Sequence, residues 1–394
     1  MSLPLLHWTE AGQACSALWR SERGAAPPKR VVLADDTTTA DDAYHLACEG
    51  TALLWRGDFQ NARQLLQALA RRIDKTPQRK QRAAKGAAIH KAPVSPADGF
   101  NLHRQAQAQR ARVLAMVLLP FNADYSIPLR RAPDARQACT EAWGPAAADG
   151  IASVASLRDL LGMTSAHEWR KKGVEIPALG AAPKNRIHPH YGVFSPVRGE
   201  YIDLVATTPL PKGDSLIAFD IGTGTGVLAA VLARRGVARV VATDQDPRAL
   251  ACARENLDQL GVADQVSLLQ ANLFPQGLAS LVVCNPPWVP ARPSSPIEYA
   301  VYDENSQMLR GFLNGLVAHL APGGEGWLIL SDLAEHLGLR SREELLAAFA
   351  AAGLRVLERR DAKPVHPKAT DGTDALHAAR AAEITSLWRL GPLH

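Results

Sequence analysis

The chain has 394 residues, of which 47% are hydrophobic and 21% are charged, and its formal net charge at pH 7 is +5. This length indicates two or three domains of roughly 100–200 residues each, and the composition is typical of a soluble globular protein. The longest uninterrupted apolar run, residues 113–119, is far shorter than the roughly 18 residues that a membrane-spanning helix needs. We therefore expect no membrane segment.

The start of the chain and its cysteines point to the cytoplasm. The first residues, MSLPLLHWTEAG, contain neither a basic segment nor a small-residue cleavage site, which predicts no signal peptide. The five cysteines are far apart and never in C-x-x-C spacing. This pattern predicts reduced thiols in a cytoplasmic protein and argues against both a disulfide framework and a zinc site.

Residues 1–185 are predicted to form a mainly helical, partly basic domain that recognises the substrate. The hydrophobic spacing of residues 58–73 predicts an amphipathic helix with Asp58 as its N-cap, and residues 103–119 repeat this pattern. The stretch between the two helices, residues 76–99, is rich in Pro, Gly and Lys. It is therefore predicted to be a loop.

A basic cluster spans the end of the first helix and this loop. Within residues 71–91 the only acidic residue is Asp74. Such a cluster can neutralise phosphates and release their counterions, which favours a nucleic-acid contact. A solvated loop between two helices is an equally good interpretation. The basic residues are Arg71, Arg72, Lys75, Arg79, Lys80, Arg82, Lys85 and Lys91.

Residues 124–186 show no clear pattern, but residues 186–394 alternate strand-like and helix-like segments and are predicted to form the second domain. Such alternation implies βαβ crossovers. The fold class is therefore α/β, a Rossmann-like doubly wound domain with a mostly parallel seven-stranded sheet. Strands are expected at 215–219, 238–243, 266–269, 280–284, 326–331, 354–359 and 383–390, and helices at 227–236, 248–261, 308–320 and 343–353.

The first of these strands runs into a glycine-rich turn, FDIGTGTG, in which Asp220 precedes three glycines. Glycine at a strand-to-helix turn allows tight geometry and close approach of a ligand to the backbone. A P-loop would need G-K-[ST], and the dinucleotide fingerprint would need glycine in place of Val227. The turn fits neither phosphate-binding motif well, and a simple tight turn is the alternative interpretation.

Two further polar residues follow strands of the same domain. Asp244 stands at the end of the second strand, where a carboxylate can bind both hydroxyls of a ribose in a doubly wound fold. Asp246, which precedes Pro247, is better explained as a helix N-cap. Asn272 follows the third strand, and its amide can recognise an adenine edge. These positions indicate a nucleoside-like ligand at the carboxyl edge of the sheet.

The fourth strand ends in the tetrapeptide Asn285-Pro286-Pro287-Trp288. Two prolines cannot continue a strand, so the backbone leaves it in a rigid, extended form. We interpret Asn285 and the carbonyl of Pro286 as acceptors for the two N–H groups of a planar nitrogen. Trp288 would stack on the flat target group and exclude water. The alternative is an ordinary proline turn with a core tryptophan.

With these motifs, residues 191–390 resemble the class I S-adenosylmethionine-dependent methyltransferases. The similarity is to the "methyltransferase small" branch, which contains release-factor glutamine methyltransferases and several rRNA and tRNA N-methyltransferases. The resemblance implies S-adenosyl-L-methionine as the cofactor and Asn285, Pro286, Pro287 and Trp288 as catalytic residues. The implied cofactor contacts are Asp220, Gly222, Thr223, Gly224, Gly226, Asp244, Gln245, Asn272, Leu273, Phe194 and Pro196, with Glu200 as a lesser candidate.

The resulting prediction is an N-methyltransferase whose acceptor is a base in RNA or a ribosome-associated target, chosen because of the basic cluster. One alternative is a protein glutamine N5-methyltransferase of the release-factor type, although tyrosine usually ends that tetrapeptide and the N-terminal domain is usually shorter. Another is a non-catalytic nucleic-acid-binding protein with a relic cofactor site. No metal is expected, because the histidines of HPHY (188–191) have no acidic or cysteine partner nearby.

Overall fold

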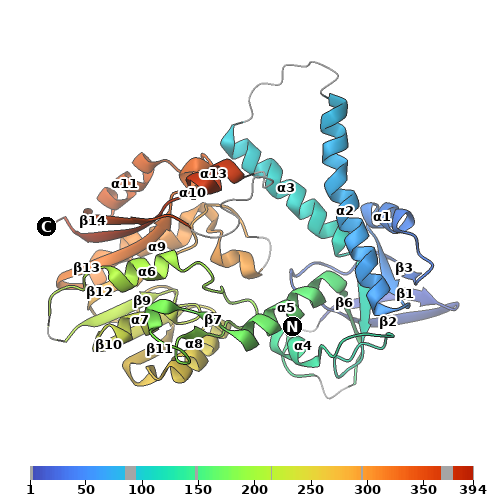
Figure 1. Cartoon of the computed structure of the whole chain (residues 1–394), viewed down its shortest axis with the longest axis horizontal. Helices are drawn as coiled ribbons and strands as arrows, with labels where there is room; N and C mark the ends of the chain where they lie inside the picture. The colour runs from blue at the N-terminus through green and yellow to red at the C-terminus, as the bar shows by residue number, and fades with distance from the viewer. Residues whose placement is uncertain are drawn as a thin grey trace. The chain divides into compact units, whose positions relative to one another are not determined.

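The computed structural model describes residues 3–84, 95–146, 150–213, 215–293, 296–364 and 376–393. The chain forms two compact units that divide between Glu168 and Trp169 (Figure 1). This division falls earlier in the chain than the predicted boundary between residues 185 and 186. Each unit has its own sheet.

The first unit contains a six-stranded sheet in the order β1-β2-β6-β5-β4-β3. Strands β3, β4 and β5 are parallel neighbours, whereas β1 pairs antiparallel with β2, and β6 pairs antiparallel with β5 and parallel with β2. The expectation of a mainly helical N-terminal domain is therefore wrong. The strands are β1 (Leu5–Glu10), β2 (Gln13–Trp19), β3 (Arg30–Ala34), β4 (Thr51–Trp55), β5 (Val117–Phe121) and β6 (Ser153–Ser156).

The helices of this unit also differ from the predicted ones in their bounds. Asp58 is confirmed as the N-cap of the first long helix, because its Oδ1 accepts a hydrogen bond of 2.8 Å from the Gln60 amide. That helix continues to Ala84, so part of the predicted loop is helical, and residues 117–119 of the second predicted helix are strand. The helices are α1 (Ala40–Cys48), α2 (Phe59–Ala84), α3 (Pro96–Leu114), α4 (Arg136–Trp143) and α5 (Leu157–Lys172), the last of which crosses the division.

The second unit contains a seven-stranded sheet in the order β11-β10-β9-β12-β13-β15-β14, which confirms the doubly wound α/β prediction. All neighbours are parallel except β15, which is antiparallel to β13 and β14. The strands are β9 (Ile217–Ile221), β10 (Arg239–Asp244), β11 (Val266–Gln270), β12 (Ala279–Cys284), β13 (Leu320–Ser331), β14 (Leu354–Ala362) and β15 (Thr385–Pro392), with a separate pair β7 (Val174–Glu175) and β8 (Arg186–Ile187).

The helices of the second unit cover both faces of its sheet (Figure 1). Helix α8 begins as predicted, because Asp246 accepts a hydrogen bond of 2.9 Å from the Arg248 amide and Pro247 fixes the first turn. The helices are α6 (Glu200–Thr207), α7 (Val227–Arg234), α8 (Pro247–Leu260), α9 (Gln307–His319), α10 (Leu333–His336), α11 (Arg342–Ala351) and α13 (His377–Ala382).

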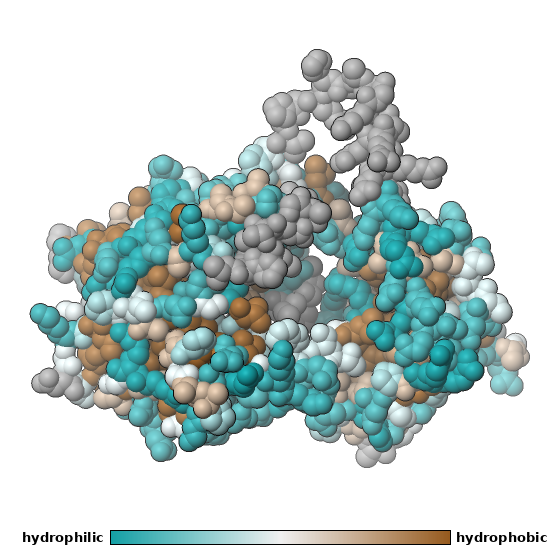
Figure 2. Space-filling view, in the orientation of Figure 1, coloured by the Kyte–Doolittle hydropathy of each residue, from teal (hydrophilic) through white to brown (hydrophobic). Residues whose placement is uncertain are grey.

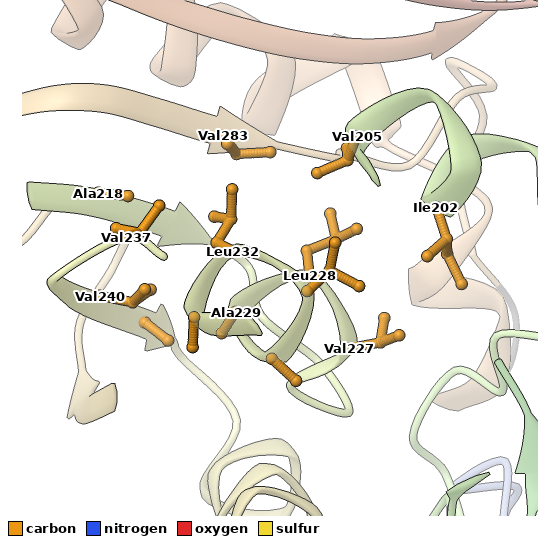
Figure 3. Packing of buried hydrophobic residues seen from close by; sticks show 14 of the residues in the cluster. Ile202, Val205, Ala218, Val227, Leu228, Ala229, Leu232, Val237, Val240 and Val283 are labelled. Carbon is orange, nitrogen blue, oxygen red and sulfur yellow. The ribbon is translucent and has the colours of Figure 1, made fainter. Parts of the chain in front are cut away.

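The core beneath α6 and α7 is built from aliphatic side chains of those helices and of the sheet. Burial of such side chains is the main favourable contribution to folding. Figure 3 shows Ile202 and Val205 of α6 beside α7. The other labelled members of the cluster are Ala218, Val227, Leu228, Ala229, Leu232, Val237, Val240 and Val283.

The strand order reverses direction next to β9. From β9 the chain adds β10 and β11 on one side and then returns to add β12 on the other side. In open α/β sheets, ligands bind outside the carboxyl ends of the strands at such a reversal. The fold therefore predicts a site at the ends of β9, β10 and β12.

The visible surface of both units contains hydrophilic and hydrophobic residues. On the face shown in Figure 2, hydrophilic residues cover most of the described chain, and hydrophobic residues form separate patches. Among the described residues, every helix is too short or too polar to cross a membrane.

Candidate functional site

The turn between β9 and α7 contains three glycines with left-handed backbone angles. The φ values are 72° at Gly222, 55° at Gly224 and 81° at Gly226. A Cβ atom on Gly222 would lie 2.6 Å from Cε of Met308, and one on Gly226 would lie 3.2 Å from Cβ of Ala253. Nothing lies within 4 Å of the corresponding position on Gly224. The outer two glycines thus permit close packing, whereas Gly224 borders open space.

The carboxylate of Asp220 links the glycine turn to the first residues of α7 through hydrogen bonds. Its side chain is almost fully buried, and Oδ2 accepts hydrogen bonds from Oγ1 of Thr223 at 2.7 Å and from the Ala229 amide at 3.1 Å. Burial raises the pKa of the Asp220 carboxyl to about 6. The structure therefore gives Asp220 a role in shaping the turn, which places the glycines and Thr223 at the sheet edge.

Asp244 lies at the end of β10 and is bonded to the same turn. Its Oδ2 accepts a hydrogen bond of 3.0 Å from the Gly224 amide, and its Oδ1 accepts one of 3.0 Å from the Asp246 amide. Burial raises the pKa of the Asp244 carboxyl. Gln245 follows directly, and its carbonyl accepts a hydrogen bond from the Gln270 side chain. Two backbone amides thus fix the orientation of this carboxylate beside the glycine turn.

The predicted adenine-side residues follow β11. Asn272 is exposed, and Leu273 is half-buried with a left-handed φ of 73°. The carbonyl of Leu273 accepts a hydrogen bond of 2.6 Å from Oγ1 of Thr243. The carbonyl of Thr243 in turn accepts hydrogen bonds from the amides of Gly222 and Thr223. Thr243, which the sequence did not single out, therefore joins this turn to the glycine turn.

The tetrapeptide leaves the sheet beside the glycine turn, because Cys284 is paired in register with Ile221 of β9. The indole Nε1–H of Trp288 donates a hydrogen bond of 2.9 Å to Oδ1 of Asn285. Asn285 and Trp288 are half-buried, and Pro286 is buried. The hydrogen bond fixes which way the amide faces and leaves one lone pair of its oxygen for another donor.

The backbone that follows the tetrapeptide is anchored to the start of α9. The amide of Val289 donates to the carbonyl of Val301, and the amide of Asp303 donates to the carbonyl of Val289. The carboxylate of Asp303 accepts hydrogen bonds of 3.1 Å from the amides of Met308 and Leu309 in the first turn of α9. The tetrapeptide is thus held at both ends.

An arginine that was not predicted from the sequence lies next to Trp288 and pairs with a buried glutamate. The guanidinium carbon of Arg198 lies 5.7 Å from the indole centroid, and Nη1 of Arg198 donates a hydrogen bond of 3.1 Å to Oε1 of Glu383. Oγ of Ser331 donates to the same oxygen at 2.7 Å. A single arginine and a single glutamate so far apart in the chain carry no periodic signal that would have identified them.

The segment that contains Arg198 also carries the lesser site candidates. Phe194 is half-buried and Pro196 is buried just before α6. Glu200 begins α6 with only 6% of its surface exposed, and burial raises the pKa of its carboxyl. These three residues lie between β8 and the first turn of α6, and the hydrogen bonds described above for the glycine turn do not involve them.

The histidines of HPHY take part in structural hydrogen bonds. Nδ1 of His188 lies 2.7 Å from the carbonyl of Arg170, and Nε2 of His190 lies 2.8 Å from Oε2 of Glu255. The His188 amide donates to Asn256, which is fully buried and also donates to the carbonyl of Thr225. Across the described ranges, no group of three or more His, Cys, Asp or Glu side chains is placed to hold a metal ion.

Comparison with known proteins finds similarity to methyltransferases, and the family model matches the part of the chain that contains the glycine turn and the tetrapeptide. Residues 184–351 match the family model of the methyltransferase small domain. The chain is 38% identical over 144 residues to a ribosomal protein L11 methyltransferase of Pelotomaculum thermopropionicum, covering 36% of this chain and 39% of that protein. It is 34% identical to a release factor glutamine methyltransferase of Moorella thermoacetica, covering 35% and 56%.

A third relative is a tRNA1(Val) (adenine(37)-N6)-methyltransferase of Shewanella loihica, which is 30% identical over 35% of this chain and 60% of its own length. The chain thus spans between 39% and 60% of these three curated relatives. In its sheet order and glycine turn the second unit resembles the class I S-adenosylmethionine-dependent methyltransferase domains. Residues 184–351 are thus similar to the methyltransferase small domain family.

Proposed function

We propose that the chain is an S-adenosyl-L-methionine-dependent N-methyltransferase that acts on a planar nitrogen. The observation that carries this proposal is the hydrogen bond from Trp288 to Oδ1 of Asn285, at the strand end next to the glycine turn. An amide that is held rigidly beside a cofactor turn is suited to orient a nitrogen acceptor. We further propose that the protein acts in the cytoplasm, because its five cysteines are free.

The residues around the glycine turn fit the cofactor. Gly224 borders open space, and Asp244 presents an oriented carboxylate next to it, which suits the hydroxyls of a ribose. Thr223, Gly222, Gly226 and Asp220 form the turn that would face the methionine end. Gln245, Asn272 and Leu273 would flank the adenosine, with Phe194 and Pro196 as cover. When bound, the cofactor supplies a methyl group activated by its positively charged sulfur.

The tetrapeptide would prepare the acceptor nitrogen. Oδ1 of Asn285 and the carbonyl of Pro286 accept its two N–H groups, which turns the lone pair out of conjugation and toward the methyl group. The lone pair would then accept the methyl group that the bound cofactor supplies, and the nitrogen would release one proton to water. Catalysis then rests on positioning and electrostatic preorganisation, without a strong general base.

The preferred acceptor is a base in RNA or in a ribosome-associated target, bound with the help of the first unit. Arg71 and Lys75 are exposed on α2 and support this choice. One member of the basic cluster is neutralised, because Arg72 lies 2.7 Å from Asp41. Asp74, the acidic residue within this range, pairs instead with Arg110 at 2.9 Å. The side chains of Arg79, Lys80 and Arg82, and the whole of Lys85 and Lys91, lie outside what the structure describes.

A glutamine side chain in a protein is the second candidate, because a release factor glutamine methyltransferase is among the relatives. The experiment incubates the protein with methyl-labelled cofactor and a cell lysate, and divides the product into RNase-treated and protease-treated halves. Label removed by RNase supports the RNA acceptor, and label removed only by protease contradicts it. No label in either half, together with no calorimetric binding of S-adenosylmethionine, would overturn the methyltransferase proposal itself.

A further inference from the structure

We propose that Arg198 is a positioning residue for the tetrapeptide: it holds the indole of Trp288 in the orientation that aims the amide of Asn285. This inference rests on the proposed function for its catalytic meaning, but its structural part is tested separately below. Arg198 was not among the predicted site residues, and it is far from the tetrapeptide in sequence.

Besides its packing against the two hydrophobic clusters of the second unit, the indole makes two polar contacts of different kinds. At its edge, the Nε1–H donates to Oδ1 of Asn285 at 2.9 Å. Over its face, the guanidinium of Arg198 lies 5.7 Å from the ring centroid, within range of a cation–π attraction. The hydrogen bond alone restrains one atom of the ring, whereas the guanidinium opposes tilting of the whole ring. Loss of Arg198 would therefore loosen Trp288 and, through the hydrogen bond, Asn285.

Arg198 can restrain the ring because it is itself anchored to the sheet. Its Nη1 donates to Oε1 of Glu383, whose side chain is fully buried. Oγ of Ser331, the last residue of β13, donates to the same oxygen, and Ser331 pairs in register with Thr385 of β15. The connection from sheet to indole is thus a short series of charge-assisted and neutral hydrogen bonds ending in a cation–π contact.

The position of Arg198 in the chain relates the proposed cofactor-binding segment to the tetrapeptide. It lies in the segment with Phe194 and Pro196, which we propose to cover the cofactor, and it contacts the tetrapeptide on the acceptor side. Arg198 therefore connects the segment proposed to cover the cofactor with the tetrapeptide proposed to contact the acceptor.

The experiment uses the full chain labelled with fluorotryptophan, with the Trp288 signal assigned by Trp288→Phe. In Arg198→Gln we expect the fluorine resonance of Trp288 to shift and broaden. In Arg198→Lys, which keeps a cation and a partner for Glu383, we expect a smaller change. Glu383→Gln should move the same resonance in the same direction, because it removes the charge that holds the guanidinium.

A matched control is Arg359→Gln. Arg359 also lies over an indole, that of Trp388 at 4.9 Å, and also pairs with a carboxylate, that of Asp361 at 2.7 Å. Because Asp361 is 45% exposed whereas Glu383 is fully buried, Arg359→Gln should cost less stability than Arg198→Gln, and it should leave the Trp288 resonance unmoved. A Trp288 resonance that is unchanged in Arg198→Gln, or equally changed in Arg359→Gln, overturns the positioning role.

The kinetic readout uses the lysate acceptor that carries label. Arg198→Gln should lower kcat about 10–100-fold, the size expected for a misaligned reacting group, with the KM for S-adenosylmethionine nearly unchanged. A change confined to that KM would contradict the proposal. Failure of the proposed function is distinguishable, because absence of S-adenosylmethionine binding by the wild type leaves the fluorine result intact.

Discussion

The amide of Gly224 donates a hydrogen bond of 3.0 Å to Oδ2 of Asp244, which joins the turn after β9 to the end of β10. The amide of Asp246 fixes the other carboxylate oxygen. Asp244, which we propose to bind the ribose, is therefore joined directly to Gly224, the glycine of this turn that borders open space. A change at either residue is expected to disturb the cofactor site more than the stability of the fold.

Asp244→Ala is predicted to weaken S-adenosylmethionine binding at least about tenfold, because hydrogen bonds to a charged group contribute roughly 1.5–3 kcal/mol. Isothermal calorimetry measures the change. Asp246→Ala is the matched control, since it removes the N-cap of α8 and should cost about 1 kcal/mol of stability with little change in affinity. Equal weakening in both variants would contradict the assignment of Asp244.

Asn285→Ala is predicted to abolish methyl transfer while leaving the dissociation constant for S-adenosylmethionine within about twofold. The reason is that Asn285 is proposed to contact the acceptor nitrogen and not the cofactor. Labelled-methyl transfer and calorimetry are measured on the same preparation. Asn314→Ala, an exposed asparagine on α9, should change neither quantity. Loss of both quantities in Asn285→Ala would indicate a structural role instead.

Gly222→Ala is predicted to destabilise the second unit by roughly 1–3 kcal/mol, because the new Cβ would meet Cε of Met308 at 2.6 Å and the residue has a φ of 72°. Gly224→Ala has only the backbone strain to overcome, about 1–2 kcal/mol, but it fills the space that borders the ligand. Urea denaturation and calorimetry should separate the two. A larger loss of stability in Gly224→Ala would oppose this account.

Asp220 gives a prediction about pH. Its pKa is raised from 3.8 to about 6 by burial, so the folded state binds its proton more tightly than the unfolded state. The stabilisation that the protonated Asp220 carboxyl contributes to the folded state is fully present below pH 3.8 and is lost as the pH rises through about 6. The free energy of unfolding of the wild type, measured relative to Asp220→Asn, should therefore fall by about 3 kcal/mol across that window. A flat difference would mean that Asp220 is not buried as a proton-binding group.

Arg71 and Lys75 test the proposed RNA contact of α2. The double variant Arg71→Ala/Lys75→Ala should weaken binding to bulk tRNA and reduce the dependence of log affinity on log salt by about one for each phosphate that is no longer neutralised. Arg136→Ala is the control, because Arg136 is exposed but paired with Asp134 at 2.7 Å. An unchanged salt dependence in the double variant would leave the first unit without an RNA contact at α2.

The second unit was predictable because its sequence carries each signal locally. Apolar runs of strand length alternate with amphipathic helices, Asp246-Pro247 marks a helix start, and Gly222 and Gly226 mark a turn that excludes side chains. The first unit was not, because β4 is buried at every position, and a short apolar run of that kind cannot be separated from a buried helix by periodicity.

The partners of the proposed catalytic residues could not be predicted for a different reason. Asn285 and Trp288 were identified by their type and spacing, but the hydrogen bond between them depends on how the proline backbone bends. Arg198 and Glu383 meet only because β15 returns antiparallel to β13, which brings the start of β15 to the end of β13. Such pairings follow from strand order, which no local pattern records.

The position of β15 has a consequence for how the molecule is made. Because residues 385–392 form an interior strand between β13 and β14, the sheet cannot close until this late segment has been synthesised. Residues up to β13 would leave the ribosome with a bare sheet edge, a surface that pairs readily with other chains. Insertion of β15 therefore completes the sheet and at the same time brings Glu383, the partner of Arg198, into place.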